Sequence, residues 1–149
     1  MGARDGVPDR RHPREPHGVT IERVRDAAGL GEFARINAEN WSPPDPLVVR
    51  YYGRAPDSLL SDDSPLRFYL ARRTGEAVAA VEVAAAGSAL AVFNLSTRLD
   101  HRGHGIGGAL LTRSLRDAAK ETPSTASRRS GESGSSNPFV VSDNIHYVK

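Results

Sequence analysis

The sequence predicts a mixed α/β (α+β) domain in which a mostly antiparallel central sheet is flanked by helices. The apolar runs Arg67–Arg72 and Ala77–Ala85 are separated only by Thr74-Gly75-Glu76, a spacing typical of a β-hairpin. A turn at Gly87-Ser88 leads into a third run, Ala89–Leu99. Segments with helical spacing stand before and after these strands, and we expect them to cover the sheet.

The elements before the hairpin follow from local signals. Val19–Val24 alternates roughly between apolar and polar residues and predicts a first strand. Asp26 can cap a helix that runs to about Asn40. Residues Trp41–Pro46 end it, because proline lacks an N–H group and restricts its predecessor. A short helix is predicted around Leu47–Tyr52.

The last predicted helix, Gly107–Glu121, is amphipathic, and the pattern breaks down after it. Thr122–Asn137 consists mainly of Ser, Thr, Gly and Arg, with Ala126 as its one apolar residue, so we predict a low-complexity loop there. Apolar residues return at Pro138–Val141 and, after a turn at Ser142–Asn144, at Ile145–Val148, which predicts a closing hairpin. The fifth strand and the helix after it are therefore expected to be degraded or absent.

Length and composition favour one domain of 149 residues, with 1–17 as a disordered arm and 18–149 as the folded unit. The formal net charge of +2 does not favour nucleic acid or an anionic membrane as a partner. The absence of cysteine excludes disulfides, thiolate metal ligands and a cysteine nucleophile. The N-terminal stretch lacks the apolar core of a secretory signal, so we expect a soluble, cytoplasmic protein.

The most informative segment is Arg102-Gly103-His104-Gly105-Ile106-Gly107-Gly108, between the last long strand and the last helix. The first N–H groups of a helix have no partner within the helix, and the helix dipole adds positive charge there. Glycines at 105 and 107 let a ligand approach the backbone closely, because no Cβ stands in the way. These features predict a site for phosphate or pyrophosphate.

Three other interpretations of this glycine segment exist. A structural turn without a ligand is the simplest. A dinucleotide fingerprint needs a second strand that ends in an acidic residue about twenty positions later. Only the isolated Glu132 stands in that stretch, so this interpretation fails. A Walker loop is excluded because no Gly-Lys-Ser/Thr ending is present.

Residues Asn94–Leu111 resemble motif A of the GNAT superfamily of N-acetyltransferases, Arg/Gln-x-x-Gly-x-Gly/Ala, and the order of predicted elements is also similar. The resemblance covers about Gly18–Glu121. It implies acetyl-CoA as co-substrate, with its pyrophosphate on the main-chain N–H groups of the glycine segment and its pantetheine arm beside Ser96 and Thr97. The cofactor-binding residues it implies are Ser96, Thr97, Arg102, Gly103, His104, Gly105, Ile106, Gly107 and Gly108.

The resemblance further implies transfer of an acetyl group to a primary amine of a small molecule or peptide, with a homodimer left open. Some relatives carry a glutamate base on the strand before motif A, but Ala89–Leu99 has no acid. Glu82 is instead the carboxylate within a strand that faces the expected cleft, and burial would raise its pKa towards that of a useful base. The alternative is that Glu82 faces solvent. Asn94 could hold a water molecule in the same cleft.

The sequence departs from the family where many relatives carry a general-acid tyrosine, on the helix after the fifth strand. Thr122–Asn137 provides neither element, and Tyr147 is the one tyrosine downstream. A catalytically impaired module that binds CoA, acyl-CoA or a protein partner without turnover is therefore an alternative function. A locally shifted reading frame between Lys120 and Pro138 would also produce this pattern.

Two smaller groups of residues complete the candidates. His101-x-x-His104 has no third ligand nearby, so no metal site is predicted. Trp41, Tyr51 and Tyr52 could line an acceptor pocket, or they could belong to the core.

Overall fold

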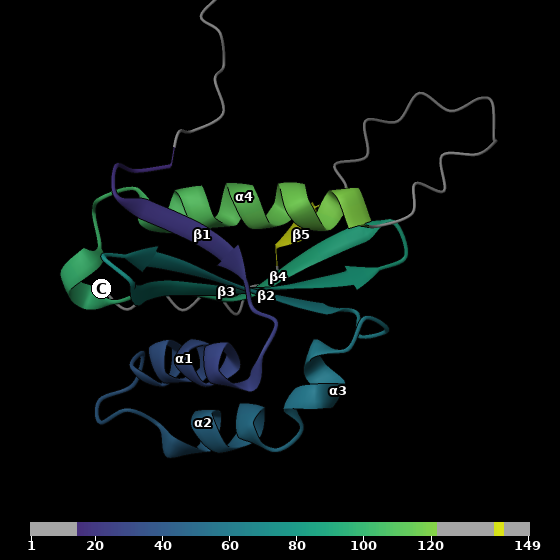
Figure 1. Cartoon of the computed structure of the whole chain (residues 1–149), viewed down its shortest axis with the longest axis horizontal. Helices are drawn as coiled ribbons and strands as arrows, with labels where there is room; N and C mark the ends of the chain where they lie inside the picture. The colour runs from purple at the N-terminus through teal and green to yellow at the C-terminus, as the bar shows by residue number, and fades with distance from the viewer. Residues whose placement is uncertain (1–14, 122–138, 142–149) are drawn as a thin grey trace, which may run out of the picture.

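The chain forms a five-stranded sheet with helices on both faces (Figure 1). The computed structural model describes residues 15–121 and the backbone of 139–141. The strands are β1 Val19–Arg23, β2 Leu66–Arg73, β3 Glu76–Ala86, β4 Ala89–Thr97 and β5 Phe139–Val141. The helices are α1 Ala27–Ala38, α2 Pro46–Gly53, α3 Pro56–Leu60 and α4 Ile106–Glu121, with a 3₁₀ turn, η1, at Leu99–His101.

The strand order is β1-β2-β3-β4-β5, with β1 to β4 antiparallel and β5 parallel to β4. This confirms the predicted mixed, mostly antiparallel sheet. The three-residue β5 pairs Phe139 with Leu90, in the segment where apolar residues return. The predicted arm up to residue 14, the predicted low-complexity loop 122–137 and the second strand of the predicted closing hairpin, with Tyr147, lie outside the described residues.

Helices α1 and α2 begin at residues that cap them. The Asp26 carboxylate accepts a hydrogen bond from the Gly29 N–H at 2.7 Å, and Asp45 accepts one from the Leu47 N–H at 2.9 Å. Helix α1 ends at Ala38, two residues earlier than predicted, because its last turn tightens. The Ala38 carbonyl accepts hydrogen bonds from the N–H groups of both Trp41 and Asp45, at 3.2 Å each. The short helix α3 was not predicted.

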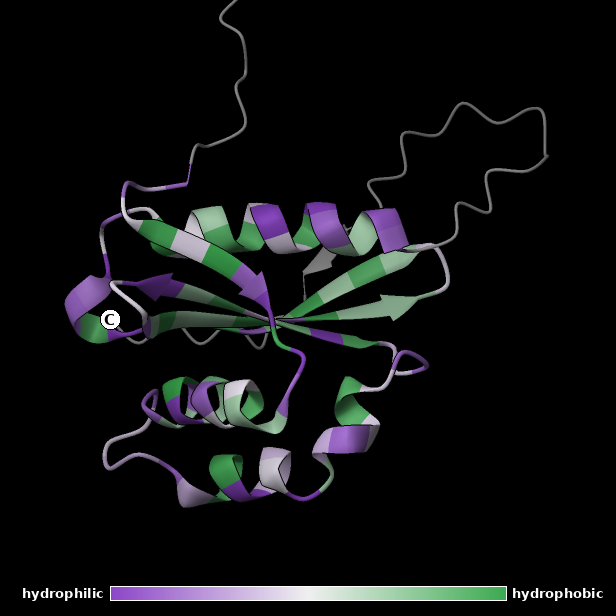
Figure 2. Cartoon of the chain, viewed as in Figure 1, coloured by the Kyte–Doolittle hydropathy of each residue, from purple (hydrophilic) through white to green (hydrophobic). Residues whose placement is uncertain are grey.

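Each face of the sheet carries its own core (Figure 2). Ile106 and Leu110 of α4 pack on one face with Val78, Val81 and Val83. On the opposite face Phe33 of α1 lies between Tyr52 and Phe68, with ring centroids 5.0 Å apart in both pairs and nearly perpendicular planes. This edge-to-face arrangement fixes Tyr52 against the sheet.

An irregularity in β4 sets the face of the sheet towards which Asn94 points. Ala80 pairs with Ser96 and Glu82 pairs with Phe93, so Asn94 and Leu95 together face only Val81. Asn94 has a φ of 53°, which asparagine tolerates better than most residues. This extra residue turns Asn94 towards the α1–α2 face, whereas Leu95 packs with the α4 core.

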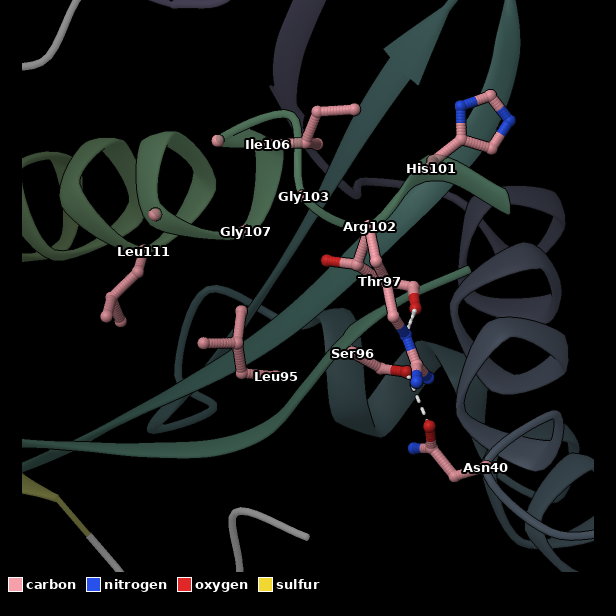
Figure 3. A pocket seen from close by; sticks show the side chains of 12 residues that line it. Asn40, Leu95, Ser96, Thr97, His101, Arg102, Gly103, Ile106, Gly107 and Leu111 are labelled. Carbon is pink, nitrogen blue, oxygen red and sulfur yellow. Dashed lines mark hydrogen bonds between the residues drawn. The ribbon is translucent and has the colours of Figure 1, made fainter. Parts of the chain in front are cut away.

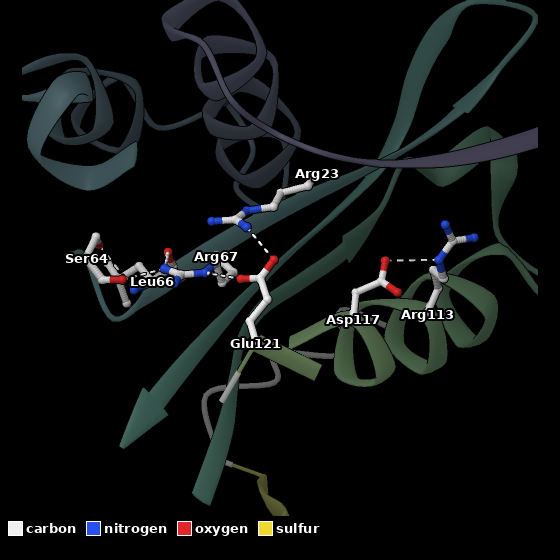
Figure 4. A network of polar contacts seen from close by, with 7 residues as sticks. All are labelled: Arg23, Ser64, Leu66, Arg67, Arg113, Asp117 and Glu121. Carbon is white, nitrogen blue, oxygen red and sulfur yellow. Dashed lines mark hydrogen bonds and ion pairs between the residues drawn. The ribbon is translucent and has the colours of Figure 1, made fainter. Parts of the chain in front are cut away.

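Arginine–carboxylate contacts join the end of α4 to the sheet (Figure 4). Glu121 accepts from Arg23 of β1 at 2.6 Å and from Arg67 of β2 at 2.8 Å. Burial raises the pKa of Glu121, but the two arginines outweigh burial and leave the pKa below its usual value. In the middle of the same helix, Arg113 contacts Glu15 at 2.7 Å. Residue 15 of the predicted arm thus lies against the domain.

Candidate functional site

A cavity of about 440 Å³ lies where β4 ends and α4 begins (Figure 3). Its walls come from the last residues of β4, the glycine segment and the first turns of α4, joined by one residue after α1. The lining residues are Asn40, Leu95, Ser96, Thr97, His101, Arg102, Gly103, Gly105, Ile106, Gly107, Gly108 and Leu111.

Three glycines shape the backbone of this cavity. Gly103 and Gly105 have φ values of 78° and 76°, which residues with a side chain rarely adopt. A Cβ on Gly107 would stand 3.1 Å from the Thr97 hydroxyl oxygen. The Ala109 N–H donates to the Gly105 carbonyl, so the N–H groups of the first turn before it have no acceptor within the helix. The cavity therefore offers backbone donors at a helix N-terminus, which suits an anion.

The cavity contains every predicted cofactor residue except His104. His104 is exposed, with Nδ1 3.3 Å from the His101 carbonyl oxygen. The sequence prediction missed Asn40, Leu95, His101 and Leu111. Leu111 could have been found, because it lies one helical turn after Gly107. Nothing local marks Asn40.

Polar side chains link the cavity to α1. The Ser96 hydroxyl donates to the Asn40 side-chain oxygen at 2.9 Å, which ties the end of β4 to the residues after α1. Arg102 extends towards the same place, and its Nε donates to the Thr97 carbonyl at 2.8 Å (Figure 3). This arginine brings positive charge to the cavity wall opposite the start of α4.

Glu82 lies at the centre of a buried polar cluster on the α1–α2 face. One of its oxygens, Oε2, accepts from the Tyr52 hydroxyl at 2.9 Å and from the Asn94 amide at 3.1 Å. The same Asn94 amide donates to the Tyr52 oxygen at 2.8 Å. Glu82 is 8% exposed, which excludes the solvent-facing alternative.

The cluster changes the acidity of two of its members. Burial raises the pKa of Glu82 above its usual value, although the hydrogen bonds from Tyr52 and Asn94 act in the opposite direction. Burial also raises the pKa of Tyr52, and the neighbouring Glu82 carboxylate raises it further. The pair therefore consists of a carboxyl group with raised proton affinity and a neutral phenol hydrogen-bonded to it.

A second pocket, of about 280 Å³, opens over this cluster between α1, α2 and β4. Its lining residues are Asn37, Trp41, Leu47, Val48, Tyr51, Tyr52 and Asn94. Trp41 is 49% exposed and Tyr51 is 63% exposed, whereas Tyr52 is buried in the core. Of the three aromatic candidates, Tyr52 therefore belongs to the core and also contributes to the pocket wall.

Neighbouring residues of the chain line the two pockets. Asn94 lines the second pocket, and the next residues along β4, Leu95 and Ser96, line the first. After α1, Asn40 lines the first pocket and Trp41 the second. Each pocket thus includes one residue of the β4 irregularity. Within the described residues, no group of three His, Asp or Glu side chains could hold a metal ion, and no helix is long and apolar enough to cross a membrane.

Backbone donors at a helix N-terminus, and a second pocket whose Tyr52 and Asn94 bond to a buried carboxyl group, are features that a group-transfer enzyme can use. The chain belongs to the acetyltransferase (GNAT) family, whose model matches residues 30–128. No curated protein matches the sequence.

Solved structures of acetyltransferases share the fold. An aminoglycoside acetyltransferase from an uncultured soil metagenomic sample aligns with a TM-score of 0.62 at 15% identity, over 87% of this chain and 82% of its own. A ribosomal-protein-alanine N-acetyltransferase from Brucella melitensis aligns with a TM-score of 0.57 at 24% identity, over 83% and 79%. A GCN5-related N-acetyltransferase from Kribbella flavida aligns with a TM-score of 0.54 at 21% identity, over 71% of this chain. This chain spans only 37% of that protein.

Proposed function

We propose that the protein transfers an acetyl group from acetyl-CoA to a primary amine. The observation that carries this proposal is the glycine-lined cavity at the start of α4, in a chain that belongs to an acetyltransferase family whose members generally use acetyl-CoA. The bound co-substrate would supply a thioester whose carbonyl carbon is open to an amine.

The residues of the first cavity fit such a co-substrate. The N–H groups from Gly103 to Gly108 would hold the pyrophosphate, where glycine φ values near 77° and the lack of Cβ atoms leave the backbone accessible. The main chain at Ser96 and Thr97, at the end of β4, would bond to the pantetheine arm. Arg102 adds a positive charge to the same wall.

The buried cluster would remove the proton that blocks the acceptor amine. An amine in the second pocket arrives as an ammonium ion and must lose a proton before it can attack. The Tyr52 oxygen can take that proton while its own hydroxyl proton passes to Oε2 of Glu82, 2.9 Å away. Tyr52 stays neutral in this relay, in keeping with its raised pKa, and Asn94 holds the phenol oxygen in place.

Binding without turnover is a second candidate, and one observation favours it. The leaving thiolate needs a proton, and no tyrosine is among the residues that line the first cavity in the described part of the chain. His101 is the one histidine among these lining residues.

Two measurements separate these functions. Calorimetry with CoA tests the cavity, and we expect binding that saturates at one site per chain. Release of free thiol from acetyl-CoA in the presence of a panel of primary amines tests turnover. Thiol release that depends on the amine supports the enzyme, binding without release supports the module, and absence of CoA binding overturns both.

A further inference from the structure

Arg102 bonds to a main-chain acceptor at the end of β4. Its Nε donates to the Thr97 carbonyl at 2.8 Å, and both residues line the first cavity. The strand register sets the direction of this carbonyl. The Arg98 N–H donates to the Val78 carbonyl at 2.9 Å, so the main-chain groups of Arg98 face β3. Because alternate residues face a partner strand, those of Thr97, which lies opposite Ala79, point away from β3.

This side of β4 is where the pantetheine arm would run under the proposed function. Among the described strands, β5 pairs with residues 90–92 of β4 and not with 93–97. Pantetheine contains amide groups, and the Thr97 carbonyl is an acceptor that one of their N–H groups can use. A guanidinium nitrogen 2.8 Å from that oxygen fills the space in front of it. Arg102 and a pantetheine amide therefore compete for one acceptor.

The Arg102 side chain also points away from the place where an anion would bind. It runs from the loop towards Ser96 and Asn40, whereas Gly103 and Gly107 belong to the opposite wall of the cavity (Figure 3). The N–H groups near these glycines are the proposed partners of pyrophosphate. In this position the charge of Arg102 lies across the cavity from the anion, and it must turn to pair with it.

A phosphate group is the stronger partner for this side chain. Arginine and phosphate carry opposite charges and can form two parallel hydrogen bonds, whereas the Thr97 carbonyl is neutral. Arg102 is exposed, so little packing opposes a change of its rotamer. No carboxylate is among the residues that line this cavity, and Arg102 is the one arginine among them.

We propose that Arg102 couples the two ends of the co-substrate. Its guanidinium turns from the Thr97 carbonyl to a pyrophosphate held by the glycine segment, and the carbonyl then accepts a pantetheine amide. Arg102 thereby makes the cavity selective for CoA thioesters over pantetheine thioesters that lack phosphate. This inference rests on the proposed function for the identity of the co-substrate, and it adds a specificity-determining residue.

The first test measures affinities for CoA and for pantetheine, which has no phosphate, by NMR titration of the full chain. Arg102→Met removes the charge and every donor but keeps a long, flexible side chain. We expect it to bind CoA at least tenfold more weakly than the parent, because an ion pair is lost. We expect it to bind pantetheine at least threefold more tightly, because the Thr97 carbonyl is no longer covered.

The opposite signs of these two effects distinguish the coupling from simpler roles. An arginine that acts only as a fixed charge would weaken CoA binding and leave the affinity for pantetheine unchanged. An arginine that only supports the loop would weaken the binding of both ligands. Either result would overturn the inference. Since Arg102 is exposed, Arg102→Met should unfold at the parental temperature.

Arg50→Met is the matched control. Arg50 is exposed on α2 and lines neither of the two cavities, so its loss changes the net charge by the same amount. It should bind CoA and pantetheine as the parent does. If it reproduced the effects of Arg102→Met, net charge alone would explain them and the inference would fail.

The second test uses cooperativity between two separate ligands. Saturating inorganic pyrophosphate should raise the affinity of the parent for pantetheine at least threefold, because it draws Arg102 away from the carbonyl. The same addition should give no gain in Arg102→Met. Pyrophosphate that leaves the parental affinity for pantetheine unchanged, or lowers it, would contradict the coupling.

The two tests also separate this inference from the proposed function. Absence of CoA binding to the parent would overturn both. Normal CoA binding to the parent, with no gain in pantetheine affinity in Arg102→Met, would overturn the coupling alone and leave the proposed acetyl transfer standing.

Discussion

Burial of Glu82 has consequences for both activity and stability, because it holds the pKa of the carboxyl group above its usual value. The proposed relay needs the carboxylate, so kcat/KM for the proposed acetyl transfer should rise with pH through this raised pKa. We expect Glu82→Gln to lower kcat/KM at least a hundredfold, the usual range for loss of a general base, and to remove this rise. CoA affinity should not change. Thiol-release assays across pH, with calorimetry, check these outcomes.

The control is Glu76→Gln, the same change at an exposed position of β3, which should leave the pH dependence of kcat/KM in place.

The raised pKa of Glu82 also makes the free energy of unfolding depend on pH. The folded state binds the proton more tightly than the unfolded chain, so Glu82 costs the parent free energy of unfolding as pH rises through its raised pKa. Between the usual glutamate pKa and the raised pKa of Glu82, the free energy of unfolding of Glu82→Gln should therefore increase relative to that of the parent. A relative stability that is flat with pH would contradict the burial argument.

Gly107 tests the assignment of the glycine-lined cavity. A side chain there meets the Thr97 hydroxyl at 3.1 Å and enters the cavity, and a carboxylate also repels phosphate. We expect Gly107→Glu to abolish CoA binding in calorimetry, as should Gly105→Asp at a φ of 76°. Gly53→Glu, where a Cβ meets nothing within 4 Å, is the control and should bind CoA normally. A folded Gly107→Glu protein with parental CoA affinity would mean that the ligand lies elsewhere.

At the scale of elements, the turn between β2 and β3 contains an avoidable strain. Thr74 and Gly75 have φ values of 50° and 82°, the combination that a two-residue hairpin turn requires. Threonine is β-branched and disfavours this conformation, whereas asparagine accepts it. We expect Thr74→Asn to raise the free energy of unfolding by about 0.5–1 kcal/mol. Thermal unfolding checks this.

Gly75→Ala is the opposite change in the same turn. It places a Cβ at a φ of 82° and should lower the free energy of unfolding by about 1 kcal/mol. Acetyl transfer should be unaltered in both variants, since neither residue lines a pocket. A destabilised Thr74→Asn protein would show that the hydroxyl bond to the Arg73 carbonyl outweighs the backbone strain.

Elements with strong local signals were predictable, and irregular ones were not. The hairpin, the capped α1 and the amphipathic α4 follow from turn residues, Asp26 and helical spacing. Helix α3 has only Pro56 as a signal, and no side chain caps its start. The extra residue in β4 was missed, because an asparagine within an apolar run reads equally well as an ordinary edge of the strand. Its φ of 53° depends on pairing with β3.

At the scale of the whole molecule, Glu121 joins three elements that are far apart in the sequence. Its contacts with Arg23 and Arg67 connect α4 to β1 and β2 (Figure 4). The carboxylate is 38% exposed, so we expect Glu121→Gln to lower the free energy of unfolding by about 1 kcal/mol or less. Because the folded-state pKa is lowered, the contribution is present above the usual glutamate pKa and is lost as pH falls through the lowered value.

Urea unfolding at low and high salt checks this contribution, which added salt should reduce. Asp117→Asn is the control on the same helix, since its partner Arg113 lies one turn away within α4, and its effect should be smaller. An equal effect of the two variants would mean that the link between α4 and the sheet adds nothing to stability.

The sequence by itself determined the elements with strong local signals and the position of the glycine-lined cavity. Glycines between a strand and a helix act through the conformation of neighbouring residues, so most residues of the cavity wall could be predicted without knowing the packing. Glu82 was also identified, because a carboxylate inside an apolar strand is unusual.

Only the tertiary structure decided what surrounds Glu82. Tyr52 comes from α2, 30 residues before Glu82, and Asn94 from β4, 12 residues after it. They converge because Phe33 holds the Tyr52 ring against the sheet and because the extra residue in β4 turns Asn94 to the same face. Local patterns report conformational preference over a few residues, whereas these contacts depend on how whole elements pack.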